Sequence, residues 1–281
     1  MTAPPSVSRQ PAATAGQPAS GPGFGHLLLA EWTKMRSVRS TVWSLTLLVV
    51  VTLGFTGLFT WLTVLGWDKS GASQRAQVVA DPVSQILGSG LEFGQLTICV
   101  LGVLVISGEY STGVIRASLL AVPRRIPMLA AKAVVFAAVV FVISECVTFP
   151  SFFIGAAILH SHVPVSLGDP GVARAVFGGG LYLTMLGLFA LAIGALVRHT
   201  AGAITGVIAF VLVLAPLTQL IPGSIGKYIH AYLPSQAGQL IGQAHQQAGQ
   251  VLTPWQGFGI FALWTAVLLA AAGYLLQWRD A

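Results

Sequence analysis

The sequence predicts an all-α integral membrane protein: a six-helix transmembrane bundle with an N-terminal interfacial helix and one further short cytoplasmic helix. Composition is the first reason, because 55% of the 281 residues are hydrophobic and only 8% are charged, whereas soluble domains carry about 25% charged residues. Spacing is the second reason. Apolar runs of about 20 residues recur along the chain, and a helix of that length crosses roughly 30 Å of hydrocarbon. The net charge of +6 suits basic residues on the cytoplasmic side of a membrane, so no nucleic-acid partner is expected.

The chain begins with two segments that are not predicted to cross the membrane. Residues 1–23 are rich in Pro, Ala, Ser, Thr and Gly, which predicts a disordered cytoplasmic tail. They lack the apolar core of a signal peptide. Residues 24–40 predict a helix on the inner membrane surface, because apolar residues recur there at helical spacing: Phe24, Leu28, Trp32 and Met35. Glu31 interrupts this apolar stripe, and a simple charged flank of the first span is the alternative interpretation.

One transmembrane domain is expected over residues 24–281. Its six spans are predicted at about 42–65, 83–107, 133–160, 175–197, 202–221 and 256–276. An even number of spans puts both termini on one side, and that side carries ten of the 14 Lys and Arg residues: Arg9, Lys34, Arg36, Arg39, Arg116, Arg124, Arg125, Lys132, Arg198 and Arg279. Because basic residues gather in the cytoplasm, we expect a multi-pass protein of the plasma or inner membrane with both termini cytoplasmic.

The connection between the second and third spans is more elaborate than a minimal loop. It reads GEYSTGVIRASLLAVPRR from Gly108 to Arg125. A polar turn leads into a short apolar run, 114–122, which predicts a helix that Pro123 ends. Its chemistry-bearing residues are Glu109, Tyr110, Arg116, Arg124 and Arg125. This pattern indicates a docking surface, with an ordinary inner loop that contacts lipid headgroups as the alternative.

The sequence contains none of the short catalytic motifs considered. A phosphate-binding Gly-x-x-x-x-Gly-Lys-[Ser/Thr] loop, a His-Glu-x-x-His helix, a Gly-x-Ser-x-Gly elbow and a Cys-x-x-Cys pair do not occur. We therefore expect no catalytic residues, no metal site and no cofactor in this chain. If ATP drives the protein, another polypeptide must hydrolyse it.

Five polar residues inside the predicted spans are candidates for a functional role. Glu145 lies about 13 residues into the third span, so roughly 20 Å from its cytoplasmic edge, and an ionisable group at that depth is a functional candidate. A protonated Glu145 hydrogen-bonded between helices is the alternative. The other four lie in the outer halves of the second and fifth spans: Glu92, Gln95, Thr218 and Gln219. From their position alone, these four residues mark the boundary between membrane and water.

The last outer connection, residues 222–255, carries a glutamine pattern. Its glutamines recur every three or four residues: Gln236, Gln239, Gln243, Gln246 and Gln250. This spacing predicts the polar face of one amphipathic helix, and Pro234 suits its first turn.

Three stretches together resemble the permeases of ABC-2-type transporters: Gly108–Arg125, Ala30–Trp43 (AEWTKMRSVRSTVW) and Tyr232–Gln239 (YLPSQAGQ). The resemblance extends from about Phe24 to the C-terminus. It implies that Gly108–Arg125 holds a coupling helix for a separate ABC ATPase subunit, which would bind ATP and Mg²⁺. It also implies a homodimer or heterodimer of permeases whose second and fifth spans line the pathway, so that Glu92, Gln95, Thr218 and Gln219 would face the cargo. The few charges in the predicted spans and the amphipathic outer helix favour a hydrophobic or amphipathic cargo, such as a drug, lipid or natural product.

Two interpretations from other classes of protein remain open. A non-transporting membrane scaffold or sensor subunit would share the docking segment and is separated from a permease only by a transport assay. An intramembrane enzyme would need converging acid, base or metal-binding groups, to which only Glu145 and scattered histidines contribute.

Overall fold

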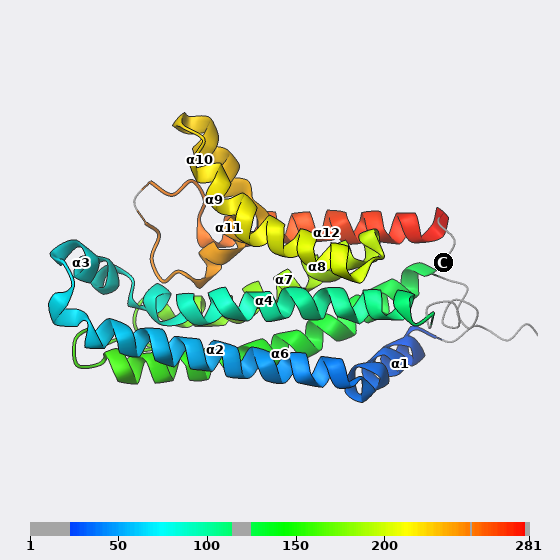
Figure 1. The fold of residues 1–281 in the computed structure, drawn as a ribbon, viewed down its shortest axis with the longest axis horizontal. Helices are drawn as coiled ribbons and strands as arrows, with labels where there is room; N and C mark the ends of the chain where they lie inside the picture. Colours follow the sequence, from blue (N-terminus) through cyan, green and yellow to red (C-terminus); the bar gives the residue numbers. More distant parts are fainter. Residues whose placement is uncertain (1–22, 114–124, 248, 279–281) are drawn as a thin grey trace, which may run out of the picture.

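The computed structural model describes residues 23–113, 125–247 and 249–278, and these ranges contain helices and no strand. Long helices run side by side along the molecule (Figure 1). Six helical segments are long and apolar enough to span a membrane: α2 (Arg39–Leu65), α4 (Pro82–Ser111), α6 (Arg125–Leu159), α7 (Val172–Val197), the segment Thr200–Gln219 and α12 (Pro254–Trp278). The prediction of six helices long and apolar enough to span a membrane is confirmed. The predicted tail and the predicted helix at 114–122 lie outside the described residues.

Local signals explain where several of these helices begin and end. Asp81 caps α4, because its Oδ1 accepts from the backbone N–H of Ser84 at 3.1 Å and Pro82 occupies the first turn. Helix α7 ends at Arg198, which adopts a left-handed conformation with φ of 58°. The fifth spanning segment is divided into α8 (Thr200–Ile208), a π-helical turn η2 (Ala209–Val213) and α9 (Leu214–Gln219). Pro216 follows the π turn and cannot donate a backbone hydrogen bond to it.

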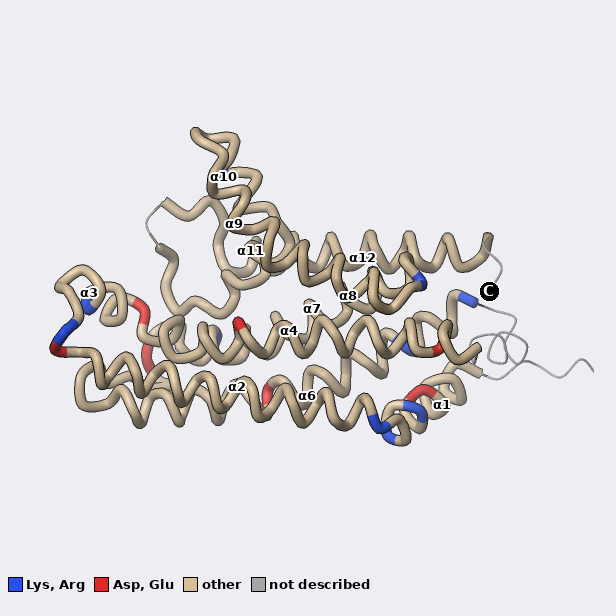
Figure 2. The backbone as a smooth tube through the Cα atoms, viewed as in Figure 1, with Lys and Arg blue, Asp and Glu red and all other residues tan. Residues whose placement is uncertain are grey.

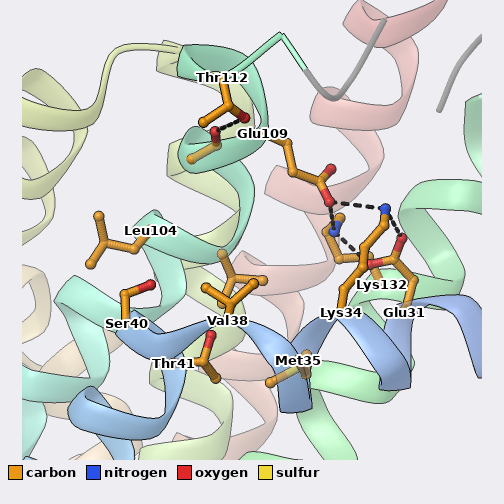
Figure 3. Close-up of a pocket in the computed structure, with 12 residues that line it drawn as sticks. Glu31, Lys34, Met35, Val38, Ser40, Thr41, Leu104, Glu109, Thr112 and Lys132 are labelled. Carbon is orange, nitrogen blue, oxygen red and sulfur yellow. Dashed lines mark hydrogen bonds and ion pairs between the residues drawn. The ribbon is translucent and has the colours of Figure 1, made fainter. Parts of the chain in front are cut away.

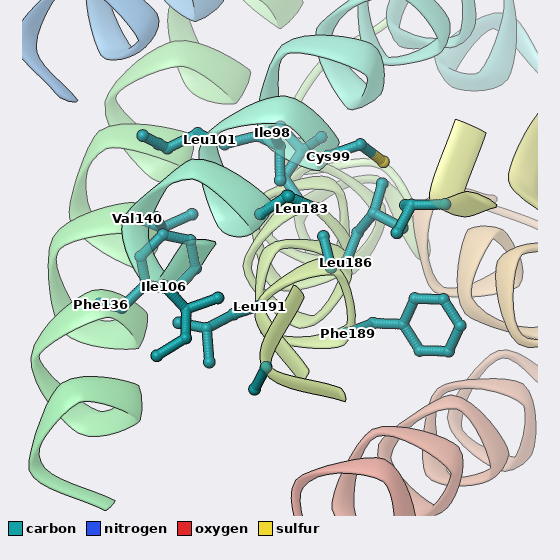
Figure 4. Packing of buried hydrophobic residues seen from close by; sticks show 14 of the residues in the cluster. Ile98, Cys99, Leu101, Ile106, Phe136, Val140, Leu183, Leu186, Phe189 and Leu191 are labelled. Atoms are coloured by element: carbon teal, nitrogen blue, oxygen red, sulfur yellow. The ribbon is translucent and has the colours of Figure 1, made fainter. Parts of the chain in front are cut away.

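Helix α7 lies at the centre of the bundle. In its most apolar window 67% of the residues are buried, against 22% for α2 and for Thr200–Gln219. It packs on α4, α6, α8 and α12, and Figure 4 shows large side chains from α4, α6 and α7 in contact. Glycines allow the closest approaches, since a Cβ atom at Gly102 of α4 would collide with the backbone of Gly187 in α7.

Shorter helices lie at the two ends of the bundle (Figure 1). At one end is α1 (Phe24–Ser37); the other, which we call the outer end, holds η1 (Trp67–Lys69), α3 (Ala72–Ala80), α10 (Gly223–Tyr232), α11 (Pro234–Gln239) and η3 (Leu240–Gly242). Most charged residues lie at these ends (Figure 2). Helix α1 stops before the predicted residue 40, because Val38 has an extended backbone that separates it from α2.

The predicted glutamine-faced helix is only partly present. Pro234 does occupy the first turn of α11, as expected. The helical segment nevertheless ends at Gly242, so the expectation of one helix through Gln250 is wrong. The guanidinium group of Arg174 explains the difference, because it donates to the backbone carbonyls of Ile241, Gln243 and Ala244 at 2.8–3.2 Å. A continued helix would use those carbonyls internally.

Candidate functional site

Four charged side chains meet where α1, α4 and α6 come together (Figure 3). We call them the ion cluster: Glu31 and Lys34 of α1, Glu109 of α4 and Lys132 of α6. The Lys132 ammonium lies 2.6 Å from Glu31 Oε2 and 2.8 Å from Glu109 Oε1. The Lys34 ammonium lies 2.8 Å from Glu31 Oε1 and 3.1 Å from Glu109 Oε1. Each lysine therefore bridges both carboxylates, and the four charges sum to zero.

The ion cluster is largely shielded from solvent. The Lys132 side chain is 3% exposed and that of Glu31 is 6% exposed, whereas Lys34 is 34% exposed. Burial alone would raise the pKa of Glu31, but the ammonium groups of Lys132 and Lys34 outweigh it and hold that pKa below its ordinary value. Burial would likewise lower the pKa of Lys34, but hydrogen bonds and attraction to Glu31 and Glu109 raise it above its ordinary value. The pairing therefore favours the charged forms of Glu31 and Lys34.

The ion cluster lies near the end of α4 and the start of α6, the two helices joined by the predicted docking segment. Glu109 lies in the last turn of α4, and Lys132 lies in the second turn of α6. Helix α4 ends at Ser111, two residues after Glu109, and α6 begins at Arg125, seven residues before Lys132. Glu31 and Lys34 are three residues apart and so share a face of α1. The two helices that flank the predicted docking segment, α4 and α6, are thus both paired with α1.

Two other predicted docking residues contact neighbouring helices at the same end. The Tyr110 ring lies 5.2 Å from the guanidinium carbon of Arg198, at the end of α7. Arg125 donates to the backbone carbonyl of Leu276 in α12 at 2.6 Å. These contacts connect the ends of α4, α6, α7 and α12. Arg116 and Arg124 lie outside the described residues.

A cavity of about 420 Å³ lies beside the ion cluster. The bend between α1 and α2 and the last turns of α4 form its walls (Figure 3). Its lining is mainly apolar, with Met35, Val38 and Leu104 among its residues.

The structure separates the predicted pathway residues into three places. Gln95 of α4 is buried, and its Oε1 accepts from Tyr182 Oη at 2.7 Å. The Glu145 carboxylate packs against Gly180 of α7, and neither of its oxygens has a hydrogen-bond partner among the described residues. Glu92 lines a small cavity at the outer half of α4.

The two predicted residues of the fifth segment lie apart from those on α4 and α6. Thr218 is buried in α9 and donates to the carbonyl of Ala215 at 2.7 Å. Its Oγ1 also lies 2.9 Å from His230 Nδ1, which attaches α10 to α9. Gln219 is the exposed last residue of α9. Thr218 therefore serves to join two helices.

Sequence reasoning missed several residues that the structure places at these sites. Lys34 and Lys132 were counted only as cytoplasmic charges, although both bind Glu31 and Glu109. The one usable signal was the position of Glu31 within the apolar stripe of α1, since a charge on a buried face needs a partner. Tyr182 gave no signal, because an aromatic residue in an apolar run is ordinary core.

Comparisons with protein families and with curated proteins identify no relative. None of the protein-family models matches the sequence, and the search of curated proteins found no match. Within the described ranges, no three His, Cys, Asp or Glu side chains come together in a group that could hold a metal ion. The function therefore has to be inferred from the site and from the resemblance in sequence.

Proposed function

We propose that this chain is the membrane-spanning permease subunit of an ABC-2-type transporter. It would export a hydrophobic or amphipathic cargo across the cell membrane, while a separate ABC ATPase subunit binds Mg²⁺ and ATP and hydrolyses it. Two permease chains, identical or different, would form the pathway. The observation that carries this proposal is the ion cluster, because it pairs the two helices that flank the docking segment, α4 and α6, with a third helix, α1.

The charge distribution supports a cytoplasmic position for the end that holds α1. Among the described residues, this end carries Lys34, Arg36, Arg39, Arg125, Lys132 and Arg198. The outer end carries Lys69, Arg75, Arg174 and Lys227. The bias agrees with the positive-inside rule. Phe24 and Trp32 are exposed on α1, which suits an interfacial helix with these side chains among the lipids and Arg36 at the headgroups.

The geometry suggests how force would pass from an ATPase to the spans. An ATPase that pushes on residues 112–124 would act at once on the end of α4 and the start of α6. The ion cluster would carry the same displacement to α1, and through Val38 to α2. Packed helices of this kind respond by rigid-body movement. Because the cluster is neutral as a whole, it can move without leaving an unpaired charge in an apolar environment.

Co-purification with the ATPase tests this proposal. The tagged chain would be extracted gently from its native membranes, and ATPase activity would be measured in nanodiscs. We expect an ATPase subunit to accompany the native chain and to be lost from the variant Arg116→Glu/Arg124→Glu. The matched control is Lys69→Glu/Lys227→Glu, which makes the same charge change at the outer end and should keep the ATPase.

Three results would count against the permease. If no ATPase accompanies the native chain, the proposed source of energy for transport is missing. If both double variants lose the ATPase equally, the loss does not come from docking. If an ATPase binds but the reconstituted complex moves no amphipathic dye across a vesicle membrane, the scaffold or sensor interpretation replaces the permease. Glu109 is left unchanged in these variants, since replacing it would disrupt the ion cluster itself.

A further inference from the structure

A second cavity lies near the outer end of the bundle. We call it the outer cavity; its volume is about 180 Å³, and it is enclosed by α4, α7 and the α11–η3 segment. Its polar lining comprises Ser84, Glu92, Tyr182, Gln239 and Gln243. Ser84, Gly88 and Glu92 follow one another at four-residue spacing, so they lie on one face of α4. A Cβ atom at Gly88 would meet nothing within 4 Å, which leaves the α4 wall open.

A directed chain of hydrogen bonds forms the back of the outer cavity. Gln239 Nε2 donates to Tyr182 Oη at 3.4 Å, and Tyr182 Oη donates to Gln95 Oε1 at 2.7 Å. Both Gln95 and Tyr182 are almost completely buried. Because the amide nitrogen of Gln239 faces Tyr182, the Gln239 Oε1 atom remains as a hydrogen-bond acceptor. Tyr182 is thereby held with its hydroxyl oxygen at the cavity wall.

The ionised groups around the outer cavity favour a cation. Glu92 is exposed and forms no salt bridge with any described residue. Ser84 donates its hydroxyl to Asp81 at 2.7 Å, which leaves the Ser84 oxygen as an acceptor. Arg174 also lies at this end, but its guanidinium group donates to three backbone carbonyls. The outer cavity therefore presents one carboxylate and several acceptor oxygens.

The middle of the bundle has the same sign of charge. Away from their first two and last two turns, the six spanning segments carry two acidic residues, Glu92 and Glu145, and no Lys or Arg. Figure 2 shows few charged positions in the middle of the bundle compared with its ends. An amphiphilic anion would meet repulsion there, whereas an amphiphilic cation would be attracted.

We propose that the outer cavity binds the protonated amine of a cationic amphiphile, with Glu92 as its counter-ion. The ammonium group would donate to the Glu92 carboxylate and to acceptor oxygens of Gln239, Ser84 and Tyr182. The apolar part of the molecule would extend over the exposed apolar surface of the spans. The inference rests on the proposed function only in taking this molecule as cargo, because the binding itself requires no ATPase.

Binding can be measured on the full-length chain in phosphatidylcholine nanodiscs without the ATPase. The probe is dansylcadaverine, a fluorescent primary amine, and its N-acetyl derivative is the uncharged control. Fluorescence in protein-free nanodiscs is subtracted. We expect saturable binding of the amine that is about tenfold tighter than binding of the acetylated probe, the size expected of one charge-assisted contact.

Variants then assign the effect to the outer cavity. Glu92→Gln should abolish the preference for the amine while leaving binding of the acetylated probe unchanged, which also shows that the variant is folded. Glu145→Gln removes the same charge outside the cavity and should lose much less of the preference. Gly88→Leu fills the open wall of the cavity and should weaken both probes.

The proposal is overturned if the acetylated probe binds as tightly as the amine, if Glu92→Gln keeps the preference, or if Glu145→Gln abolishes it equally. The last result would place the effect in the overall field of the bundle. Failure of the permease proposal appears in a different measurement, since loss of ATPase co-purification would leave amine binding to the isolated chain intact.

Discussion

Replacing Lys132 with methionine is the sharpest test of the ion cluster. The substitution keeps an unbranched apolar stem but removes the ammonium group that lies 2.6 Å from Glu31 and 2.8 Å from Glu109. Two carboxylates then share Lys34, which is 34% exposed. Because removing one partner of a buried ion pair leaves an uncompensated charge, we expect Lys132→Met to lower the free energy of unfolding by about 3–5 kcal/mol.

Two further variants provide the control. Lys34→Met removes a cation of the same type but leaves Lys132 paired with both carboxylates, so its cost should be about 1 kcal/mol or less. Glu31→Gln combined with Lys132→Met leaves Glu109 paired with Lys34 and should recover part of the loss. Equilibrium unfolding by SDS in mixed micelles measures all three. If Lys132→Met costs no more than Lys34→Met, the ion cluster does not hold α1 to the bundle.

The remaining predictions concern pH and helix packing. Folding lowers the pKa of Glu31, so the contribution of Glu31 to stability is present above the ordinary pKa of 4.5 and is lost as the pH falls below it. Folding raises the pKa of Lys34, so the contribution of Lys34 is present below the ordinary pKa of 10.5 and is lost as the pH rises beyond it. The unfolding midpoint should therefore fall at both acid and alkaline pH. The variant Glu31→Gln should show a smaller fall at acid pH. Gly102→Ala should lower the free energy of unfolding more than Gly180→Ala, by about 1–3 kcal/mol. The new Cβ atom meets the backbone of Gly187 in the first variant, but it meets the flexible side chain of Glu145 in the second. Equal losses in the two variants would contradict this explanation.

Helix positions followed from the sequence because each depends on local patterns. Apolar runs long enough to cross a membrane gave the six segments, and Asp81-Pro82 marks the start of α4. The position of Glu109 within the docking segment also follows directly from chain order. The end of the glutamine-faced helix could not be predicted from the sequence. It depends on Arg174, about 70 residues earlier in the chain, which donates to carbonyls that a longer helix would use internally.

The contacts that define both sites join residues far apart in the sequence. Lys132 and Glu31 are 101 positions apart, and Tyr182 and Gln95 are 87 positions apart. Such pairs depend on which face each helix turns towards its neighbour. In helices that are apolar all round, composition alone does not define that face. Glu31 was the exception, because α1 is amphipathic enough for a misplaced charge to be noticed.

The ion cluster and the outer cavity share one helix but should act separately. Glu109 and Glu92 are 17 residues apart on α4, which corresponds to about 25 Å. Between them, Gly102 packs against the α7 backbone so closely that α4 and α7 should move as one body. The far wall is fixed to the same body, because Gly178 of α7 contacts the Ile241 carbonyl and Arg174 binds the residues that follow.

This arrangement makes the outer cavity a preformed site. We therefore expect Lys132→Met to leave the affinity for dansylcadaverine nearly unchanged in nanodiscs, even though it destabilises the chain and should impair coupling to an ATPase. Glu92→Gln should have the opposite pattern, with weaker binding and normal ATPase association. If Lys132→Met weakened amine binding as strongly as Glu92→Gln, the ion cluster would control the shape of the outer cavity through α4. The close packing of α4 on α7 would then not be rigid.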